Sequence, residues 1–412
     1  MERSDQTTRT ASLATGLAEW AHGLRPTRAD LDLAERALLD TVAVALAARD
    51  HPVSRLAAGL CEGARWAVAG HVLDFDDLHM DSTTHVSAVC VPTALATGGG
   101  ARAYLAAAGV MARLGTALGW PHYSSGWHAT CTAGAPASAA GAAVALGLDP
   151  EQIATAIALA VPGAGGVQRA FGTDAKPLQV GFAVETGIRA ARLAAAGARA
   201  DPTALDAWLS LVGGDPDAAH PPGAVDPAVP GGLAIKIYPC CYALQRPISA
   251  LAELATAGGG LDPDQVTRVV LRTPEATVTP LIHHRPQTGL QGKFSLEYAA
   301  AAALLDRHPG FASFSDEAVR RPAARRLAGL VEIKLDPGGS WLLDGVLEAA
   351  VHTSDGEIRT VSQRFPPGSP ARPPDPAQLG AKLADCVAGL DTDPASWTWD
   401  DAAQVLREGL SP

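Results

Sequence analysis

Residues 213–232 read Gly213-Gly-Asp-Pro-Asp-Ala-Ala-His-Pro-Pro-Gly-Ala-Val-Asp-Pro-Ala-Val-Pro-Gly-Gly232. Proline and glycine recur too often here for a regular helix or strand, so this stretch predicts a break between two parts of the chain. The patterns of apolar residues differ on its two sides, and that difference indicates the fold class.

The part before this break is helical in character. Thr27 or Asp30 can cap a helix whose apolar side chains recur at helical spacing as far as Leu46. Leu148-Asp149-Pro150-Glu151 resembles an N-cap followed by proline at the first helical position. Alanine is the best helix former, and its small side chain lets helices approach closely. Ala-rich segments predict helices at 101–118, 135–148, 151–161 and 179–196.

The part after the break contains short runs of β-branched and apolar residues, which favour strands. Four such runs occupy Val266–Arg272, Leu330–Leu335, 345–353 and 358–364. The last two flank Asp355-Gly356, a strong signal for a hairpin turn. Helices are expected between the strands at Pro247–Ala257 and Leu296–Leu305. Residues from about 240 to 365 therefore predict a smaller α+β domain.

A second proline-rich break, at residues 365–376, precedes a final predicted helix at Ala377–Leu390. That helix could pack back on the first, helical part of the chain. We find no internal repeat.

Composition excludes several classes of protein. The net charge of −11 argues against a nucleic-acid surface, and an anionic substrate would need a local basic pocket. The polar N-terminus lacks the apolar core of a signal peptide, and we expect neither a membrane span nor a membrane partner. The six cysteines show no CxxC spacing, which disfavours structural zinc or an iron–sulfur cluster. A cytoplasmic protein with reduced thiols is expected.

The strongest chemical signal is His71-Val-Leu-Asp74-Phe-Asp76-Asp77-Leu-His79-Met-Asp81-Ser-Thr-Thr-His85. An Ala/Leu-rich protein has no packing reason to gather four carboxylates and three imidazoles within fifteen residues. Such groups shift one another's pKa and can hold a proton donor or acceptor ready near neutral pH. Taken alone, the segment fits a solvated loop between helices equally well.

Other segments carry polar side chains with open interpretations. His128 precedes an Ala/Gly-rich helix whose free N–H groups could bind an anion, although a satisfied, half-buried histidine is commoner. Lys176, with Arg169 nearby in sequence, could neutralise a carboxylate, act as a base, or lie solvated in a loop. Cys240-Cys241 fits packing better than metal binding. Tyr298 opens a helix and could reach a cleft.

Taken together, these segments resemble the MmgE/PrpD family, which includes 2-methylcitrate dehydratase, cis-aconitate decarboxylase and iminodisuccinate epimerase. The resemblance covers most of the chain and rests on five ordered matches. They are His71-Val-Leu-Asp74-Phe-Asp76-Asp77 with His85, Gly126-Trp127-His128-Ala-Thr130, Gly172-Thr173-Asp174-Ala175-Lys176-Pro177-Leu178, Lys236-Ile-Tyr238-Pro239-Cys240-Cys241 and Lys293-Phe294-Ser295-Leu296-Glu297-Tyr298.

The resemblance implies a mainly α fold in which a smaller α+β lid domain is inserted before the C-terminus of a large all-helical domain. The expected boundaries are residues 1–238 and 376–412 for the helical domain and 239–375 for the lid. A homodimer without a cofactor or a metal is also implied, with its active site at the cleft between the domains.

The family's active-site positions, carried over by motif, are Asp74, His85, His128, Lys176 and Tyr298. We expect a second set of residues to bind the substrate: His79, Thr130, Arg169, Gln245 and Lys293. The chain departs from the family at Gln245, where a histidine is frequent, because an amide cannot move a proton. It also departs at His85-Val86, where many members have His-Pro, and the stretches 50–74 and 96–105 are shorter than the family's.

The implied substrates are polycarboxylic acids. Removing a proton beside a carboxylate, or losing CO₂ there, builds negative charge as an enediolate, which Lys176 and Arg169 could stabilise. The leading expectation is a cofactor-independent lyase that dehydrates a 2-methylcitrate-type hydroxy acid. The alternatives are a cis-aconitate-type decarboxylase, an epimerase of a dicarboxylate, and a non-catalytic relative that only binds a polycarboxylate.

Overall fold

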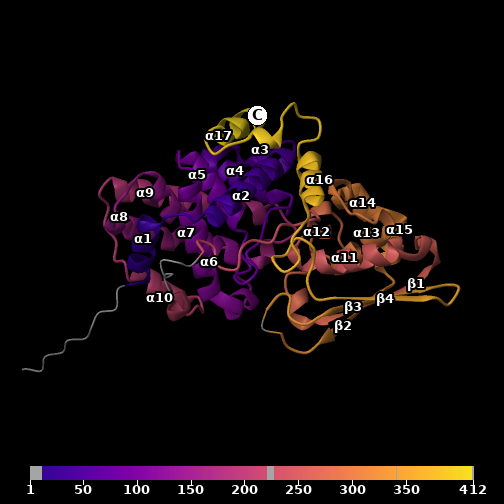
Figure 1. Ribbon diagram of the computed structural model, residues 1–412. Helices are drawn as coiled ribbons and strands as arrows, with labels where there is room; N and C mark the ends of the chain where they lie inside the picture. The colour runs from indigo at the N-terminus through magenta and orange to yellow at the C-terminus, as the bar shows by residue number, and fades with distance from the viewer. Residues whose placement is uncertain (1–11, 220–226, 340, 411–412) are drawn as a thin grey trace, which may run out of the picture.

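The computed structural model describes residues 12–219, 227–339 and 341–410 (Figure 1). The break between the two parts is described on both sides of residues 220–226 and contains turns and a short 3₁₀ helix at Pro216–Ala219. Residues 220–226, which belong to the proline- and glycine-rich break, lie outside the described residues. So do residues 1–11, on which the expectation about a signal peptide rests.

The first part of the chain is a body of packed helices, as predicted. Its elements are α1 (Leu13–Gly23), α2 (Arg28–Ala47), α3 (Pro52–Leu56), α4 (Glu62–Val72), α5 (Val86–Ala96), α6 (Ala101–Ser124), α7 (Ala129–Ala145), α8 (Pro150–Ala160), α9 (Ala175–Ala195) and α10 (Ala204–Leu211). Thr27 and Asp30 form a capping box at the start of α2, and Asp149 forms another with Gln152 at the start of α8.

The centre of the body is the crossing of α7 with α6 and α9. Small side chains permit this close approach, because α7 is built almost wholly of buried alanine, glycine, serine and threonine. Gly187 of α9 faces Ser138 and Ala139 of α7 so closely that a Cβ there would lie 2.6 Å from the Ala139 nitrogen. The Ala-rich composition thus fixes the spacing of the central helices.

The second part is the predicted α+β domain with its own apolar core. Its strands are β1 (Val266–Pro274), β2 (Val331–Asp336), β3 (Leu347–Thr353) and β4 (Ile358–Gln363), and its helices are α11 (Tyr242–Thr256), α12 (Gly289–Gly292), α13 (Leu296–Asp306), α14 (Asp316–Arg320) and α15 (Pro322–Ala328). The four-stranded sheet has the order β2-β1-β3-β4. Figure 1 shows the helices gathered on one side of it.

Connections within the sheet follow from its local sequence. β1 and β2 are parallel and are joined by the segment that contains α12 to α15, whereas β3 and β4 form an antiparallel hairpin. Asp355-Gly356 turns this hairpin, as predicted, and Gly356 has a φ of +89° that favours glycine. The mainly α fold with a small α+β part is therefore confirmed.

The C-terminal segment returns to the helical body. Helix α16 (Pro376–Cys386) ends four residues earlier than the predicted helix and packs on α2, where Lys382 forms an ion pair of 2.6 Å with Asp40. Helix α17 (Ala402–Gly409) also packs on α2 and was not predicted; it is only eight residues long, although Ala402, Val405 and Leu406 recur at helical spacing. In Figure 1, α16 lies between the helical body and the α+β domain, which is called the lid below.

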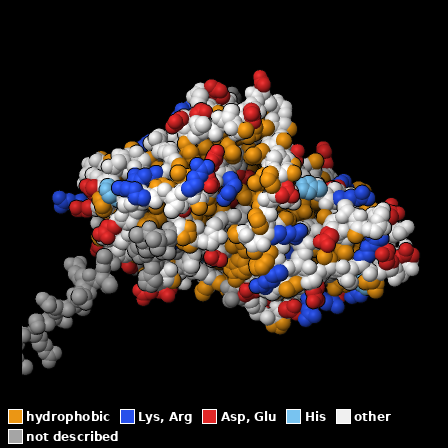
Figure 2. Space-filling model, in the orientation of Figure 1, with side chains coloured by type: hydrophobic (Ala, Val, Ile, Leu, Met, Phe, Trp, Pro, Cys, Tyr) orange, Lys and Arg blue, Asp and Glu red, His pale blue; other side chains and the backbone are white. Residues whose placement is uncertain are grey.

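Charges of both signs are mixed over the visible surface of both parts (Figure 2). Within the described part of the chain, no helix combines the length and apolarity that a bilayer crossing requires.

The close packing of α7 and α9 yields a first prediction. Gly187→Ala should lower the free energy of unfolding by about 1–3 kcal/mol, because the added methyl group overlaps α7. Gly380→Ala in α16 is the matched control, since nothing lies within 4 Å of a Cβ there, and alanine should stabilise that helix by up to about 1 kcal/mol. Urea unfolding measures both changes. Equal effects of the two substitutions would contradict this account of the helix crossing.

Candidate active site

The acidic segment lies where α4 ends and α5 begins. Helix α4 stops at Val72, and Asp74 turns the chain with a φ of +54°, a conformation that aspartate tolerates better than most residues. The Asp74 side chain is buried. The sequence thus accepts some backbone strain in order to place a carboxylate inside the protein.

Two lysines from distant segments hold Asp74. Lys236 Nζ lies 2.7 Å from Asp74 Oδ1 and 2.9 Å from the Asp74 carbonyl oxygen, and Lys176 Nζ lies 3.2 Å from Oδ1. Burial alone would raise the pKa of Asp74, but the two lysines outweigh it and hold that pKa well below its ordinary value. Although burial opposes it, Asp74 raises the pKa of Lys236. Asp74 and Lys236 are therefore charged at neutral pH.

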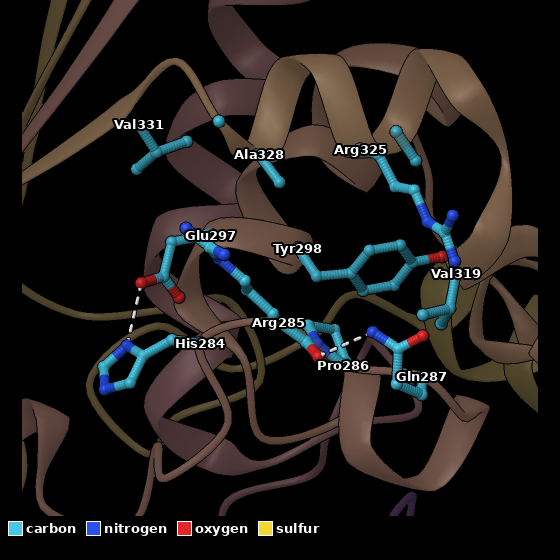
Figure 3. Close-up of a pocket in the computed structure, with 12 residues that line it drawn as sticks. His284, Arg285, Pro286, Gln287, Glu297, Tyr298, Val319, Arg325, Ala328 and Val331 are labelled. Carbon is cyan, nitrogen blue, oxygen red and sulfur yellow. Dashed lines mark hydrogen bonds and ion pairs between the residues drawn. The ribbon is translucent and has the colours of Figure 1, made fainter.

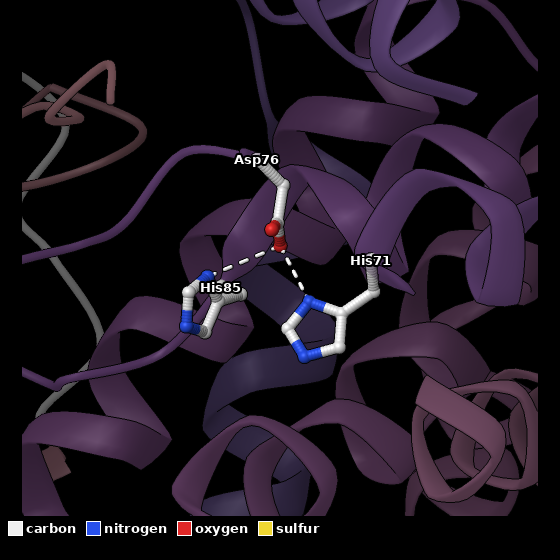
Figure 4. A group of neighbouring side chains, drawn as sticks. All are labelled: His71, Asp76 and His85. Atoms are coloured by element: carbon white, nitrogen blue, oxygen red, sulfur yellow. Dashed lines mark hydrogen bonds and ion pairs between the residues drawn. The ribbon is translucent and has the colours of Figure 1, made fainter. Parts of the chain in front are cut away.

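A second buried carboxylate, Asp76, lies between two histidines (Figure 4). Its Oδ2 is 2.7 Å from His71 Nδ1 and 3.1 Å from His85 Nδ1. Burial, opposed by Asp76, lowers the pKa of both imidazoles, that of His85 to about 4. Despite its own burial, Asp76 has a pKa well below the ordinary value, first because of His71 and His85. At neutral pH the carboxylate is ionised and the imidazoles are neutral.

His128 joins this group from the start of α7. The His71 ring centroid lies 4.8 Å from that of His85 and 5.8 Å from that of His128. Burial, followed by the nearby charge of Lys176, lowers the pKa of His128 well below its ordinary value. His122, six residues earlier, differs because both its nitrogens are within hydrogen-bonding distance of protein oxygens.

The structure brings four of the five expected catalytic residues together. Asp74, His85, His128 and Lys176 surround the His71 ring, with Lys176 Nζ at 2.7 Å from His71 Nε2. His85, His128 and Lys176 each stand at the beginning of a helix, α5, α7 and α9 respectively. Helix beginnings favour negative charge nearby, so the arrangement suits an anionic ligand.

The structure places Tyr298 elsewhere. Its hydroxyl donates a hydrogen bond to the Ser313 carbonyl oxygen, and its ring lines a hollow of about 680 Å³ in the lid. Figure 3 shows Tyr298 in this hollow together with Arg285 and Arg325. The sequence could place Tyr298 at the start of a helix but could not indicate which way its side chain points.

The residues expected to bind substrate have different surroundings. Lys293 Nζ donates to the carbonyl oxygens of Leu73 and Pro239, and burial lowers its pKa to about 8. Thr130 Oγ1 accepts from the His85 backbone nitrogen, so it positions the histidine. Arg169 is exposed.

The other two expected binding residues are occupied by contacts within the protein. His79 Nε2 lies 2.6 Å from the Pro230 carbonyl oxygen, and its Nδ1 lies 2.8 Å from Ser82 Oγ. Gln245 Oε1 accepts from the backbone nitrogens of Ile237 and Tyr238, and its Nε2 donates to the Tyr238 carbonyl oxygen. Gln245 therefore holds the shape of the segment that carries Lys236.

Sequence reasoning did not single out His71, Asp76, Lys236 or Gln179 as site residues. His71, Asp76 and Lys236 lie inside segments that match the family, and that position could have identified them as site residues. Gln179, one turn beyond Lys176 on α9, lies 2.6 Å from His128 Nδ1 and had no such signal.

His71, Asp76 and His85 offer ligand atoms within 4.8 Å of one another, a spacing that could hold a metal ion. The surrounding charges do not fit one. Lys236 Nζ lies 3.9 Å from Asp76 Oδ1, and Lys176 Nζ lies 2.7 Å from His71 Nε2. Two ammonium groups beside the ligand set already balance the carboxylates, so a divalent cation would be repelled.

Three buried polar atoms of this group have no hydrogen-bond partner among the described residues. They are Asp74 Oδ2, Asp76 Oδ1 and His128 Nε2. Unpaired buried polar atoms are costly, and they concentrate where a ligand or water completes the site. The two carboxylate oxygens can only accept, for example from a hydroxyl group or water, whereas Lys176 and Lys236 beside them can pair with negative charge.

Comparison with known proteins gives consistent matches. Models of the MmgE/PrpD N-terminal and C-terminal domains match residues 64–208 and 238–401. Cis-aconitate decarboxylase of Aspergillus terreus is 26% identical over 365 residues, which cover 78% of this chain and 72% of that protein. The Homo sapiens cis-aconitate decarboxylase is 30% identical over 223 residues, 51% of this chain and 45% of that protein.

Asp77 beside the cluster generates a prediction on pH. Burial raises its pKa to about 7, although hydrogen bonds from Ser87 oppose this. An unfolded aspartate titrates near pH ~4, so the folded state binds the extra proton and loses stability as the pH rises from ~4 to ~7. Asp77→Asn cannot lose that proton, so its stability relative to the parent should rise over this window.

The measurement is urea unfolding of the parent and Asp77→Asn at about pH 5 and about pH 8. The free energy of unfolding of Asp77→Asn minus that of the parent should be larger at the higher pH, by an amount on the order of 2 kcal/mol. Asp81→Asn, an exposed position in the same loop, is the matched control. A difference for Asp77→Asn that is the same at both pH values would show this account to be wrong.

Proposed function

The chain belongs to the MmgE/PrpD family, and from that premise we propose that it is a cofactor-independent lyase that acts on a polycarboxylic acid. The family assignment supports a lyase-type enzyme in general. The observation that carries the proposal is the group of buried lysines, Lys176, Lys236 and Lys293, near His128, whose Nε2 has no hydrogen-bond partner among the described residues.

The charges of the site complement such a substrate. Lys176 and Lys236 pair with Asp74, and Lys293 adds a third ammonium group held by backbone carbonyls. An ammonium group has three donors, and among the described residues Lys176 uses two of them, one toward His71 and one toward Asp74. The remaining donor is available to a substrate carboxylate.

Decarboxylation of a cis-aconitate-type tricarboxylate is the first specific reaction that we propose, because the relatives described above carry that name. Loss of CO₂ leaves its bonding electrons on the substrate, where they delocalise onto a neighbouring carboxylate as an enediolate. Lys176 and the His128 side chain can stabilise this charge in a site without bulk water. A proton must then be delivered to carbon to complete the product.

Dehydration of a 2-methylcitrate-type hydroxy acid is the second candidate, supported by the side chain of His85. This reaction needs a base to remove the proton beside the carboxylate and an acid to protonate the leaving hydroxyl. His85 is a neutral imidazole beside the ionised Asp76, as a general base requires. Product identification by NMR distinguishes the reactions. A decarboxylase should release CO₂ from cis-aconitate, a dehydratase should form an alkene from 2-methylcitrate, and an epimerase should invert a carbon of a dicarboxylate.

The site residues give a prediction for either reaction. His128→Ala should lower kcat by about 10²-fold, the usual effect of removing a hydrogen-bond donor to the charge that develops on the substrate. Lys176→Ala should also raise KM about tenfold, because a charge partner of the substrate carboxylate is lost. His22→Ala, a position outside all matched segments, is the control. Normal kcat/KM in both site variants, with the proteins folded, would refute the proposal, as would failure of the parent to turn over any polycarboxylate.

The charge balance around Asp76 gives a prediction on metals. Since Lys176 and Lys236 already compensate the carboxylates, activity should remain within about twofold after EDTA treatment and dialysis. The assay compares treated enzyme with enzyme resupplied with zinc, iron or magnesium. Activity that disappears with EDTA and returns with one metal would show that the cofactor-independent mechanism is wrong.

A further inference from the structure

The side-chain amide of Gln179 has only one orientation that fits its backbone contacts. The Val167 nitrogen, which can only donate, lies 3.1 Å from Gln179 Oε1, and the Val167 oxygen, which can only accept, lies 3.3 Å from Gln179 Nε2. Val167 is itself held beside the histidine by its bridge to Trp127. The contacts therefore identify which end of the amide faces His128.

That end is the NH₂ group, and it determines the proton position on His128. Gln179 Nε2 lies 2.6 Å from His128 Nδ1. An amide NH₂ group can only donate, so Nδ1 accepts and the proton of the neutral imidazole must reside on Nε2. Nε2 is the atom that lacks a partner among the described residues. His128 thus presents an unused N–H group to the site.

His85 has the opposite arrangement. Its Nδ1 lies 3.0 Å from the Asp77 carbonyl oxygen and 3.1 Å from Asp76 Oδ2. Both oxygens are acceptors, so Nδ1 carries the proton and Nε2 has a free lone pair. Among the described residues, Nε2 of His85 forms no hydrogen bond. The same site therefore holds two neutral imidazoles, of which His128 can donate a hydrogen bond from Nε2 and His85 can accept one at Nε2.

We propose that Gln179 is a positioning residue that fixes His128 as the Nε2–H tautomer, so that His128 donates to the negative charge that develops on the substrate. The catalytic part of this inference rests on the proposed function, whereas the tautomer is a property of the free protein. A neutral imidazole N–H suits this task because it stabilises an oxyanion without first having to bind a proton. Lys176 lies three residues earlier on α9, so one helix supplies both the charge partner and the tautomer control.

The decisive experiment is long-range ¹H–¹⁵N NMR of ¹⁵N-histidine-labelled free enzyme, with His128 assigned from the signals that disappear in His128→Asn. The parent should show a protonated Nε2 and an unprotonated Nδ1. Gln179→Glu should move the proton to Nδ1, because a carboxylate accepts where the amide donated. Gln179→Met, similar in length but unable to donate or accept, should leave the two tautomers mixed.

Kinetics with cis-aconitate, or with whichever polycarboxylate the parent converts, provide the second measurement. Gln179→Glu should lower kcat about 10²-fold near pH 8, because Nε2 then lacks its hydrogen. The loss should be smaller near pH 6, because the new carboxylate makes the imidazole more basic and an imidazolium carries hydrogen on both nitrogens. Gln179→Met should lower kcat less and without this recovery. Gln152→Glu, which adds the same charge on the surface, should leave kcat unchanged.

The outcomes separate the possible explanations. Gln179→Glu keeps an oxygen that can accept from the Val167 nitrogen, whereas Gln179→Met loses both contacts with Val167. A purely structural role therefore predicts a loss for Gln179→Met at least as large as that for Gln179→Glu, with similar pH profiles and an unchanged tautomer; that result would overturn the proposal. A parent enzyme with its His128 proton on Nδ1 would overturn it as well. If the parent converts no polycarboxylate, the proposed function fails, while the NMR spectra still decide whether Gln179 fixes the tautomer.

Discussion

The ion pairs of Asp74 with Lys176 and Lys236 are the interaction on which the site depends. They join the end of α4 to the start of α9 and to the segment that leads into the lid. Removing one member of a buried pair commonly costs about 3–5 kcal/mol, because the other charge is left unpaired in a poor solvent for ions. The same three side chains thus tie the two parts of the chain together and keep charge in the interior.

The second consequence of this network is that the nearby imidazoles remain neutral. Burial disfavours imidazolium in His71, His85 and His128, and for His128 the positive charge of Lys176 adds to that effect. Each neutral imidazole has one donor and one acceptor nitrogen, so its surroundings decide what it offers. Charge held on the lysines and aspartates therefore leaves the histidines free to act as directional hydrogen-bonding groups.

Much of the fold could be predicted from local sequence, because its signals are local. Helical spacing of apolar residues, the caps at Thr27 and Asp149, and the Asp355-Gly356 turn each act over a few residues. Helix α17 was missed although Ala402, Val405 and Leu406 recur at helical spacing, because it is only eight residues long. For the site, matched segments supplied Asp74, His85, His128 and Lys176. The direction of the Tyr298 side chain depends on packing within the α+β domain, and the spacing of residues in the sequence does not indicate it.

The two glutamines show why the rest of the site could not be predicted. Gln245 drew attention because it stands where a histidine is frequent, yet its amide is fully engaged with the backbone of Ile237, Tyr238 and Cys240. Gln179 drew none, yet its amide lies against His128. What an amide does depends on which group faces each of its ends. That is set by backbone segments such as Val167, twelve residues away in sequence, and no local pattern records it.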